Sequence, residues 1–238
     1  MHFHLRPGVL PADFHHMATI LNATHTVQTS PAELAEHHNW WPAGSISCLT
    51  MACDEAGQVI GFAEAHRFPN TAEGKFYADL AVLPTFAGHG AGSALLADVE
   101  QFIASHGATR IFGDVQDNDA ASLAYVEKRG YKVERHWFTS RLDLSSFDPS
   151  AFPAPEVEGI RFFTLADDDT PAMRRALYEL YGRTMPDIPG YEAKSFMTYE
   201  TWERFMFDGD DPRTDWVVIA ADGDRLVGVT QMVTEQDH

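Results

Sequence analysis

Three things are scarce in this 238-residue chain: cysteine, long apolar runs and positive charge. The two cysteines, Cys48 and Cys53, are too few for a disulfide framework and are interpreted as ordinary strand residues. No apolar run approaches the ~20 residues of a membrane span. The first residues also lack the charged-then-apolar order of a signal peptide. We therefore expect a cytoplasmic protein without a membrane partner.

Acidic residues outnumber basic ones by 35 to 17, which gives a formal net charge of −18. Both parts of the chain are acidic: the net charge is −8 for residues 1–150 and −10 for residues 151–238. A nucleic-acid-binding face needs clustered positive charge to displace counterions, so no nucleic-acid partner is expected. An acidic surface can attract a cationic amine or can serve solubility alone, and composition leaves both open.

Hydrophobic spacing predicts a mixed sheet covered by helices in the first part of the chain. Ser30, Pro31 and Glu33 form a helix start with an N-cap serine, an N1 proline and an N3 glutamate. The expected order is β-α-α-β-β-β-α-β-α-β. Its strands are expected at 3–7, 46–53, 58–66, 75–83, 110–116 and 131–144, and its helices at 12–24, 30–41, 93–106 and 120–129.

Three glycines at alternate positions, Gly88, Gly90 and Gly92, join an expected strand to an amphipathic helix. Glycine lets the backbone approach a ligand and adopt positive φ, and a helix N-terminus presents free N–H groups to anions. The turn predicts an anion site, with a ligand-free tight turn as the alternative. A P-loop would need Gly-Lys-Ser/Thr, and a dinucleotide turn would need Gly-x-Gly-x-x-Gly, so neither pattern fits.

The stretch from Val82 and Pro84 to Gly90 and Gly92 resembles the acetyl-CoA-binding motif of the GNAT superfamily of N-acetyltransferases, with Ala87 where the family usually has Arg or Gln. The resemblance implies an α/β (α+β) GNAT fold and acetyl-CoA, or another acyl-CoA, as cosubstrate. It also implies that the strand before the turn splays from its neighbour and pairs with the pantetheine arm through backbone groups. The implied cofactor-binding residues are Leu80, Ala81, Val82, Ala87, Gly88, His89, Gly90, Ala91, Gly92, Ser93, Asn118, Ser122 and Tyr125.

The reaction implied by the resemblance is direct attack of a neutral amine on the thioester, which needs a base and an acid for the leaving thiolate. Tyr125 fits the family's acid when counted from Asn118, whereas counting back from Gly130 puts Val126 in that position. Tyr125 is therefore a candidate acid or a wall of the CoA site.

Two carboxylates are candidates for the base, each with a solvated charge as the alternative. Asp79 ends the strand before the turn, and Glu64 lies on the strand before that one. Alternation places Phe62, Glu64 and His66 on one face of their strand. His66 and His89 are further candidates, with His89 expected to border the phosphates.

The remaining histidines, including His37 and His38, show no metal-ligand spacing, so we interpret them as surface residues and expect no metal. Trp40 and Trp41 end the second expected helix, where the fold builds its acceptor pocket. They are either core or interface residues, or a cation–π platform for an amine.

A proline-rich stretch divides the chain into a GNAT domain at 1–147, a linker at 148–157 and a second unit at 158–238. In the second unit, a strand near 159–162, helices at 170–183 and 198–207 and a hairpin at 216–232 repeat the first elements of the chain. We interpret it as a partial GNAT-like repeat without the glycine turn. Truncation, completion by another chain such as a homodimer partner, and packing on the first domain all remain open.

The function expected from the sequence is acetyl transfer to a small-molecule primary amine. The alternative is a non-catalytic acyl-CoA-binding or regulatory module. The acceptor itself lies beyond the sequence, because this fold serves many amines.

Overall fold

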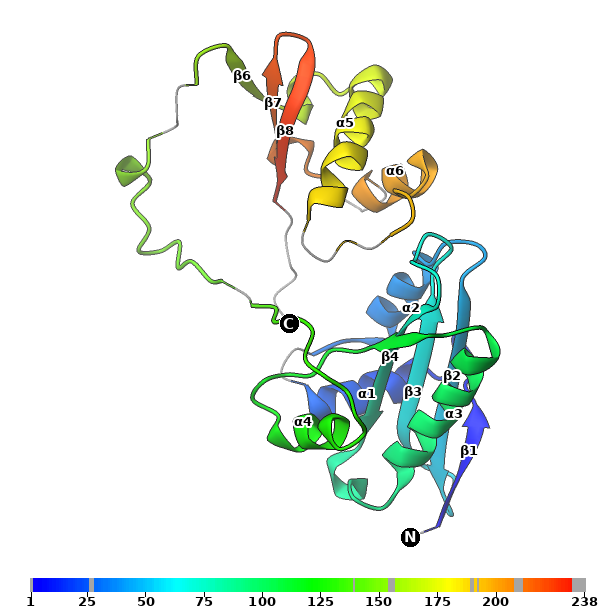
Figure 1. Cartoon of the computed structure of the whole chain (residues 1–238). Helices are drawn as coiled ribbons and strands as arrows, with labels where there is room; N and C mark the ends of the chain where they lie inside the picture. Colours follow the sequence, from blue (N-terminus) through cyan, green and yellow to red (C-terminus); the bar gives the residue numbers. More distant parts are fainter. Residues whose placement is uncertain are drawn as a thin grey trace.

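The computed structural model describes residues 2–25, 28–138, 140–153, 157–188, 191, 193–207 and 212–232. The first unit is a five-stranded sheet in the order β1-β2-β3-β4-β5, and all neighbours are antiparallel except β4 and β5 (Figure 1). Its strands are β1 (Phe3–Pro7), β2 (Ile46–Asp54), β3 (Val59–Arg67), β4 (Lys75–Val82) and β5 (Arg110–Phe112). Its helices are α1 (Phe14–Thr24), α2 (Pro31–Asn39), α3 (Ala91–Ser105) and α4 (Ala120–Glu127).

Helices cover the sheet on both faces, and alternation along the strands decides which side chains meet them. Ala63 and Ala65 of β3 pack with Leu95 and Val99 of α3 in one core cluster. Phe62 lies on the opposite face and belongs to a second cluster together with residues of α1. Figure 1 shows α3 crossing one side of the sheet, with α1 and α2 on the other. The sheet therefore offers a separate working face on the α1–α2 side.

Local signals placed the starts of α2 and α4 correctly, whereas α1 begins two residues later and α3 two residues earlier than expected. At α2, the Ser30 hydroxyl accepts from the Glu33 N–H at 3.2 Å, and the Glu33 carboxylate accepts from the Ser30 N–H at 2.6 Å. These two bonds satisfy backbone donors that a helix end would otherwise leave free. At α4, Asp119 is the N-cap and accepts from the Ser122 N–H at 3.0 Å.

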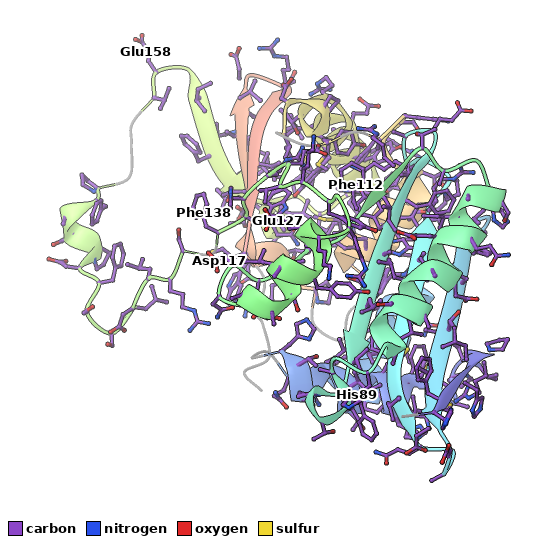
Figure 2. All side chains as sticks on the ribbon, turned by 60° about the horizontal axis from the view of Figure 1, so that its bottom comes forward. His89, Phe112, Asp117, Glu127, Phe138 and Glu158 are labelled. Carbon is purple, nitrogen blue, oxygen red and sulfur yellow. The ribbon has the colours of Figure 1, made fainter. Side chains whose placement is uncertain are left out.

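The expected strand at 131–144 is wrong for the residues that the structure describes in that range. Residues 131–138 and 140–144 follow an irregular path away from the sheet, and Figure 2 shows Phe138 on this segment. The Trp137 and Phe138 side chains are 69% and 90% exposed. Apolar alternation selects a face for a strand, but a strand also needs a neighbouring ladder. Here the neighbouring β5 extends only from Arg110 to Phe112, shorter than the expected 110–116.

The second unit has its own three-stranded antiparallel sheet, in the order β6-β7-β8. Its elements are β6 (Ile160–Thr164), α5 (Pro171–Thr184), α6 (Tyr199–Phe207), β7 (Val217–Asp222) and β8 (Arg225–Gln231). Short 3-10 turns lie at Pro84–Phe86, Pro149–Ala151, Leu165–Asp167, Met185–Asp187 and Thr214–Trp216. Leu177 and Trp202 are buried at the centre of the second unit.

The element order of the second unit matches β1-α1-α2-β2-β3 of the first. Both hairpins also carry a register shift at the same place, between Ala52 and Cys53 and between Ala220 and Ala221. A bulge is a specific feature of a strand pair, so its recurrence supports the interpretation of a repeated unit. That these residues form a partial GNAT-like repeat stays a prediction. Of the expected linker, residues 154–156 lie outside the described residues.

A few contacts join the second unit to the first. The Lys194 N–H donates to the Asn70 carbonyl at 2.7 Å, and the Phe205 ring meets the Trp40 ring edge-on at 6.1 Å between centroids. The Arg204 guanidinium donates to the Asn39 carbonyl at 3.4 Å. These contacts fall on the C-terminal end of α2 and on the loop between β3 and β4. Among the helices described, none is both long and apolar enough to span a membrane.

Candidate active site

The glycine turn adopts the backbone that its sequence predicts. Gly88 has φ +79° and Gly90 has φ +95°, a left-handed conformation that disfavours any side chain. Gly90 is the N-cap of α3 and has no side chain with which to cap the helix. The first N–H groups of α3 therefore face outward at the positive end of the helix dipole.

Among the described residues, little crowds Gly88 and Gly90. A Cβ added at Gly88 would meet no atom within 4 Å, and one at Gly90 would meet only the Phe3 ring at 3.9 Å. Gly88, His89 and Gly90 are exposed, and Figure 2 labels His89 on this loop. The positive φ angles account for glycine at positions 88 and 90, and the described residues leave open space beside them.

The strand before the turn is open on one side. Its parallel pairing with β5 covers only Lys75–Arg110, Phe76–Ile111 and Tyr77–Phe112. Beyond Tyr77, β4 keeps its antiparallel pairing with β3 but has no described partner on the β5 side. The two parallel strands therefore separate just where the chain approaches the glycine turn. An extended ligand arm could pair with the free edge.

Tyr125 reaches this opening from α4. A Cβ at Gly92 would contact the Tyr125 hydroxyl, Leu80 and Val82, each at 3.7 Å. The Tyr125 hydroxyl oxygen is buried and has no hydrogen-bond partner among the described residues. A buried phenol usually has a partner, so this orphan donor indicates space for a ligand group. Of the other expected cofactor residues nearby, Asn118 precedes α4 and is exposed, and the backbone N–H of Ser122 on α4 donates to Asp119.

The two candidate bases lie side by side on adjacent strands, on the same face of the sheet. Glu64 on β3 and Asp79 on β4 are directly opposite in the antiparallel register. Facing residues in such a pair have Cβ atoms about 5 Å apart. Both lie on the α1–α2 side, since their neighbours Phe62 and Ala81 belong to the core cluster on that side. Their environments differ.

Glu64 is buried and paired. Its carboxylate lies 3.2 Å from His38 Nε2, and both side chains are almost fully covered, at 10% and 12% exposure. The interpretation of His38 as a surface residue is therefore wrong, whereas His37 is exposed. His38 lies on α2 and Trp41 just beyond its C-terminal end, and their three-residue spacing lets the two rings stack toward the sheet. That spacing is the signal in the sequence that would have found the contact.

Asp79 keeps an exposed surface on the same face. Desolvation by the surrounding protein raises its carboxyl pKa, and the nearby charges of Glu64 and Asp114 raise it further. Both causes disfavour the ionised form, so the proton is held more strongly than by an ordinary carboxyl. A carboxylate with a raised pKa is a stronger base.

A row of rings lies beside the carboxylates. Trp41 stacks on His38 at 4.3 Å and lies 4.6 Å from His66, which in turn stacks on Tyr77 at 5.6 Å. Burial lowers the pKa of His66, which favours its neutral form. Trp41 Nε1 and His66 Nδ1 are buried without a partner among the described residues. The adjacent tryptophans therefore have different surroundings: Trp41 lies on the α1–α2 face of the sheet, and Trp40 contacts Phe205 of the second unit.

No cluster of three or more histidine, cysteine, aspartate or glutamate side chains with a metal-binding arrangement occurs within the described ranges. This face carries carboxylates, imidazoles, a phenol and backbone amides.

Comparisons with known proteins converge on one family. Residues 14–131 match the acetyltransferase (GNAT) family. The L-2,4-diaminobutyric acid acetyltransferase of Nocardia farcinica is 27% identical over 114 residues, which are 45% of this chain and 55% of that relative. The chain thus spans about half the length of the curated relative that it matches.

One solved structure supports the fold, and a second is reported as a similar protein only. A GCN5-related N-acetyltransferase from Sphaerobacter thermophilus superposes with a TM-score of 0.64 at 20% identity, over 95% of this chain and 70% of that one. The phosphinothricin acetyltransferase of Sinorhizobium meliloti, solved in complex with AcCoA, has a TM-score of 0.48 at 25% identity over 57% of this chain and 77% of its own. The first unit of this chain is a GNAT-family acetyltransferase domain, with the mixed α/β fold of that family.

Proposed function

We propose that this domain transfers an acetyl group from acetyl-CoA to the primary amine of a small molecule, by direct attack in a ternary complex. The observation that carries the proposal is the position of Asp79. It is a carboxylate with a raised pKa, exposed on β4 where β4 leaves β5, nine residues before Gly88 of the glycine turn.

The turn and the open strand edge suit the two ends of the cosubstrate. The backbone N–H groups from Gly88 to Ser93 are positioned to receive the diphosphate. The unpaired edge of β4 at Leu80 to Val82 is positioned to receive the pantetheine arm. Acetyl-CoA supplies an activated thioester, and the chain supplies its orientation.

Asp79 accepts the proton of the attacking amine, directly or through a water molecule. Proton transfer is most effective when the pKa of the base lies near the working pH, so the raised pKa of Asp79 suits this role. Glu64 holds His38 and adds negative charge beside Asp79. The Tyr125 hydroxyl, which has no partner among the described residues, donates to the departing thiolate.

The acceptor is a small cationic amine. Glu64, Asp79 and Asp114 make this face acidic, and negative charge attracts an ammonium group. The curated relative, by its name, acetylates L-2,4-diaminobutyric acid. Diamines and diamino acids are therefore the first compounds to test.

The test is acetyl-CoA consumption by the full chain over a panel of diamines, diamino acids and monoamines. Turnover with at least one amine, lost in Asp79→Asn, supports the proposal. Cofactor binding by calorimetry without turnover on any amine overturns it in favour of a non-catalytic acyl-CoA-binding module.

A further inference from the structure

The phosphate-binding turn has no cation of its own. Between Lys75 and Arg110 the chain contains neither lysine nor arginine, so the turn and α3 provide none, and β4 carries only Lys75, at the end far from the turn. Ala87 occupies the position where a cationic or amide side chain was expected. In a protein with net charge −18, a polyanionic ligand here would meet backbone dipoles alone.

A cation reaches the turn from another element. Arg129 follows α4, whose last residue is Glu127 (Figure 2). Its guanidinium donates to the Ser93 hydroxyl at 2.6 Å and to the Tyr125 carbonyl at 2.9 Å. Ser93 is the third residue of α3, within the turn of helix whose N–H groups are free. The guanidinium carbon also lies 3.5 Å from the centroid of the Tyr125 ring.

This arginine is held in place but not neutralised. The ring contact and the two hydrogen bonds fix its plane, yet within the described ranges no carboxylate forms an ion pair with it. Acidic residues outnumber basic ones by two to one in this chain, so an ordered arginine without an acidic partner is unexpected. A guanidinium has five N–H donors, and the two hydrogen bonds of Arg129 leave the others available to a ligand.

We propose that Arg129 binds a phosphate of the acyl-CoA cosubstrate and supplies the charge that Ala87 does not. The inference rests on the proposed function only for the identity of the ligand. Placement beside Ser93 assigns Arg129 to the diphosphate, whose oxygens the helix end attracts. The 3′-phosphate of CoA is the other source of the same chemistry. Because Arg129 also lies on the Tyr125 ring, phosphate binding and the position of the Tyr125 hydroxyl are coupled.

Calorimetry on the full chain without acceptor tests this. Arg129→Gln is titrated with CoA, with dephospho-CoA, which lacks the 3′-phosphate, and with pantetheine, which lacks all phosphates. Lys128→Gln is the matched control, because it removes one positive charge from the adjacent exposed position. Thermal unfolding without ligand checks that each variant folds.

Arg129→Gln is expected to weaken CoA and dephospho-CoA by a similar factor of about ten or more, as for other hydrogen bonds to charged groups. Pantetheine binding should not change, and Lys128→Gln should stay within about twofold of the wild type, as surface charges usually do. A loss seen with CoA but not with dephospho-CoA assigns the contact to the 3′-phosphate. Arg129→Lys should keep part of the affinity, since it retains charge without the planar fork.

An unchanged CoA affinity in Arg129→Gln overturns the inference, as does an equal loss for pantetheine, which would mean a structural role. Because no acceptor is present, wild-type protein that binds CoA but transfers nothing would refute only the proposed function. Wild-type protein that binds no CoA would refute both.

Discussion

His38 Nε2 lies 3.2 Å from Glu64 Oε1, and this contact separates two carboxylates that the sequence could not rank. Glu64 is covered by α2 and engaged by an imidazole, whereas Asp79, directly opposite on β4, stays exposed. A base must reach the amine of the acceptor, so the exposed carboxylate is better placed for that role. The buried one positions His38 and raises the pKa of its neighbour.

Asp79→Asn is expected to lower kcat by about 10²- to 10⁴-fold, the usual contribution of a general base, and to leave CoA affinity unchanged. Glu64→Gln, which keeps the shape of the side chain, should have a smaller effect. Steady-state kinetics and calorimetry on both variants provide the measurements. A greater loss in Glu64→Gln than in Asp79→Asn would assign the base to Glu64 instead.

The raised pKa of Asp79 also predicts a trade-off between activity and stability. A carboxyl that binds its proton more strongly in the folded than in the unfolded state favours folding at low pH. That contribution is lost as pH rises through the folded pKa. At pH 7 to 8 the charge therefore destabilises the fold, and Asp79→Asn should raise Tm, by about 2–4 °C for each kcal/mol.

Differential scanning fluorimetry from about pH 4 to pH 8 checks this trade-off. The gain from Asp79→Asn should be small near the unfolded carboxyl pKa and should grow as the pH rises through the folded value. Asp117→Asn removes an exposed carboxylate and serves as the control. A gain that is constant with pH would show that the charge of Asp79 is not its cause.

A second carboxylate, that of Asp13, has its pKa shifted in the opposite direction to that of Asp79. Both Asp13 oxygens accept from the Arg6 guanidinium, at 2.7 and 2.8 Å, and Oδ2 also accepts the Val9 N–H at 2.7 Å. These hydrogen bonds lower the pKa of Asp13, with that from Arg6 the largest cause. The pair ties β1 to the start of α1. Its contribution to stability is present above the unfolded carboxyl pKa and is lost as pH falls through the lower folded value.

Asp13→Asn is expected to lower the free energy of unfolding by about 2–3 kcal/mol at pH 7, less than for a fully buried pair because Arg6 is one-third exposed. Urea unfolding at pH 7 and near pH 3 measures the difference, which should shrink in acid. Glu55→Gln, in an exposed hairpin turn, is the control. An equal loss at both pH values would contradict a role for the ion pair.

Local signals were enough for most of the fold. The capping box at Ser30, the glycine turn and the hairpin around Gly57 each depend on residues close in sequence, and each was predicted in place. The strand at 131–144 was not, because a strand depends on a partner that local pattern does not identify.

In the candidate site too, the sequence identified individual residues but not the contacts between distant parts of the chain. Sequence placed Glu64, Asp79 and Tyr125 among the candidates, and alternation put Glu64 and His66 on one face. It missed His38 and Arg129, whose contacts with Glu64 and Ser93 join residues far apart in the chain. For Arg129, which we propose to bind phosphate, the signal was indirect: the turn proposed to bind phosphate has no lysine or arginine of its own, so a cation would have to come from another segment.

The glycines of the turn allow the sharpest comparison. Gly90 has φ +95°, so Gly90→Ala forces a side chain into the left-handed region at a cost of about 1–2 kcal/mol. The backbone is expected to move, and the N–H groups of α3 lose their alignment. Gly92 has no such φ, and a Cβ there meets its neighbours at an ordinary 3.7 Å. Gly92→Ala is therefore the matched control, with the same added methyl two residues away.

Calorimetry with CoA should show at least a tenfold loss of affinity in Gly90→Ala, the equivalent of about 1.4 kcal/mol. The loss in Gly92→Ala should be only a few-fold, and circular dichroism should show that both variants are folded. If Gly90→Ala bound CoA as the wild type does, the amides at the start of α3 would not be the groups that hold the diphosphate. Both variants add the same methyl group, so a larger loss of CoA affinity in Gly90→Ala must come from the positive φ of residue 90 and not from the added volume.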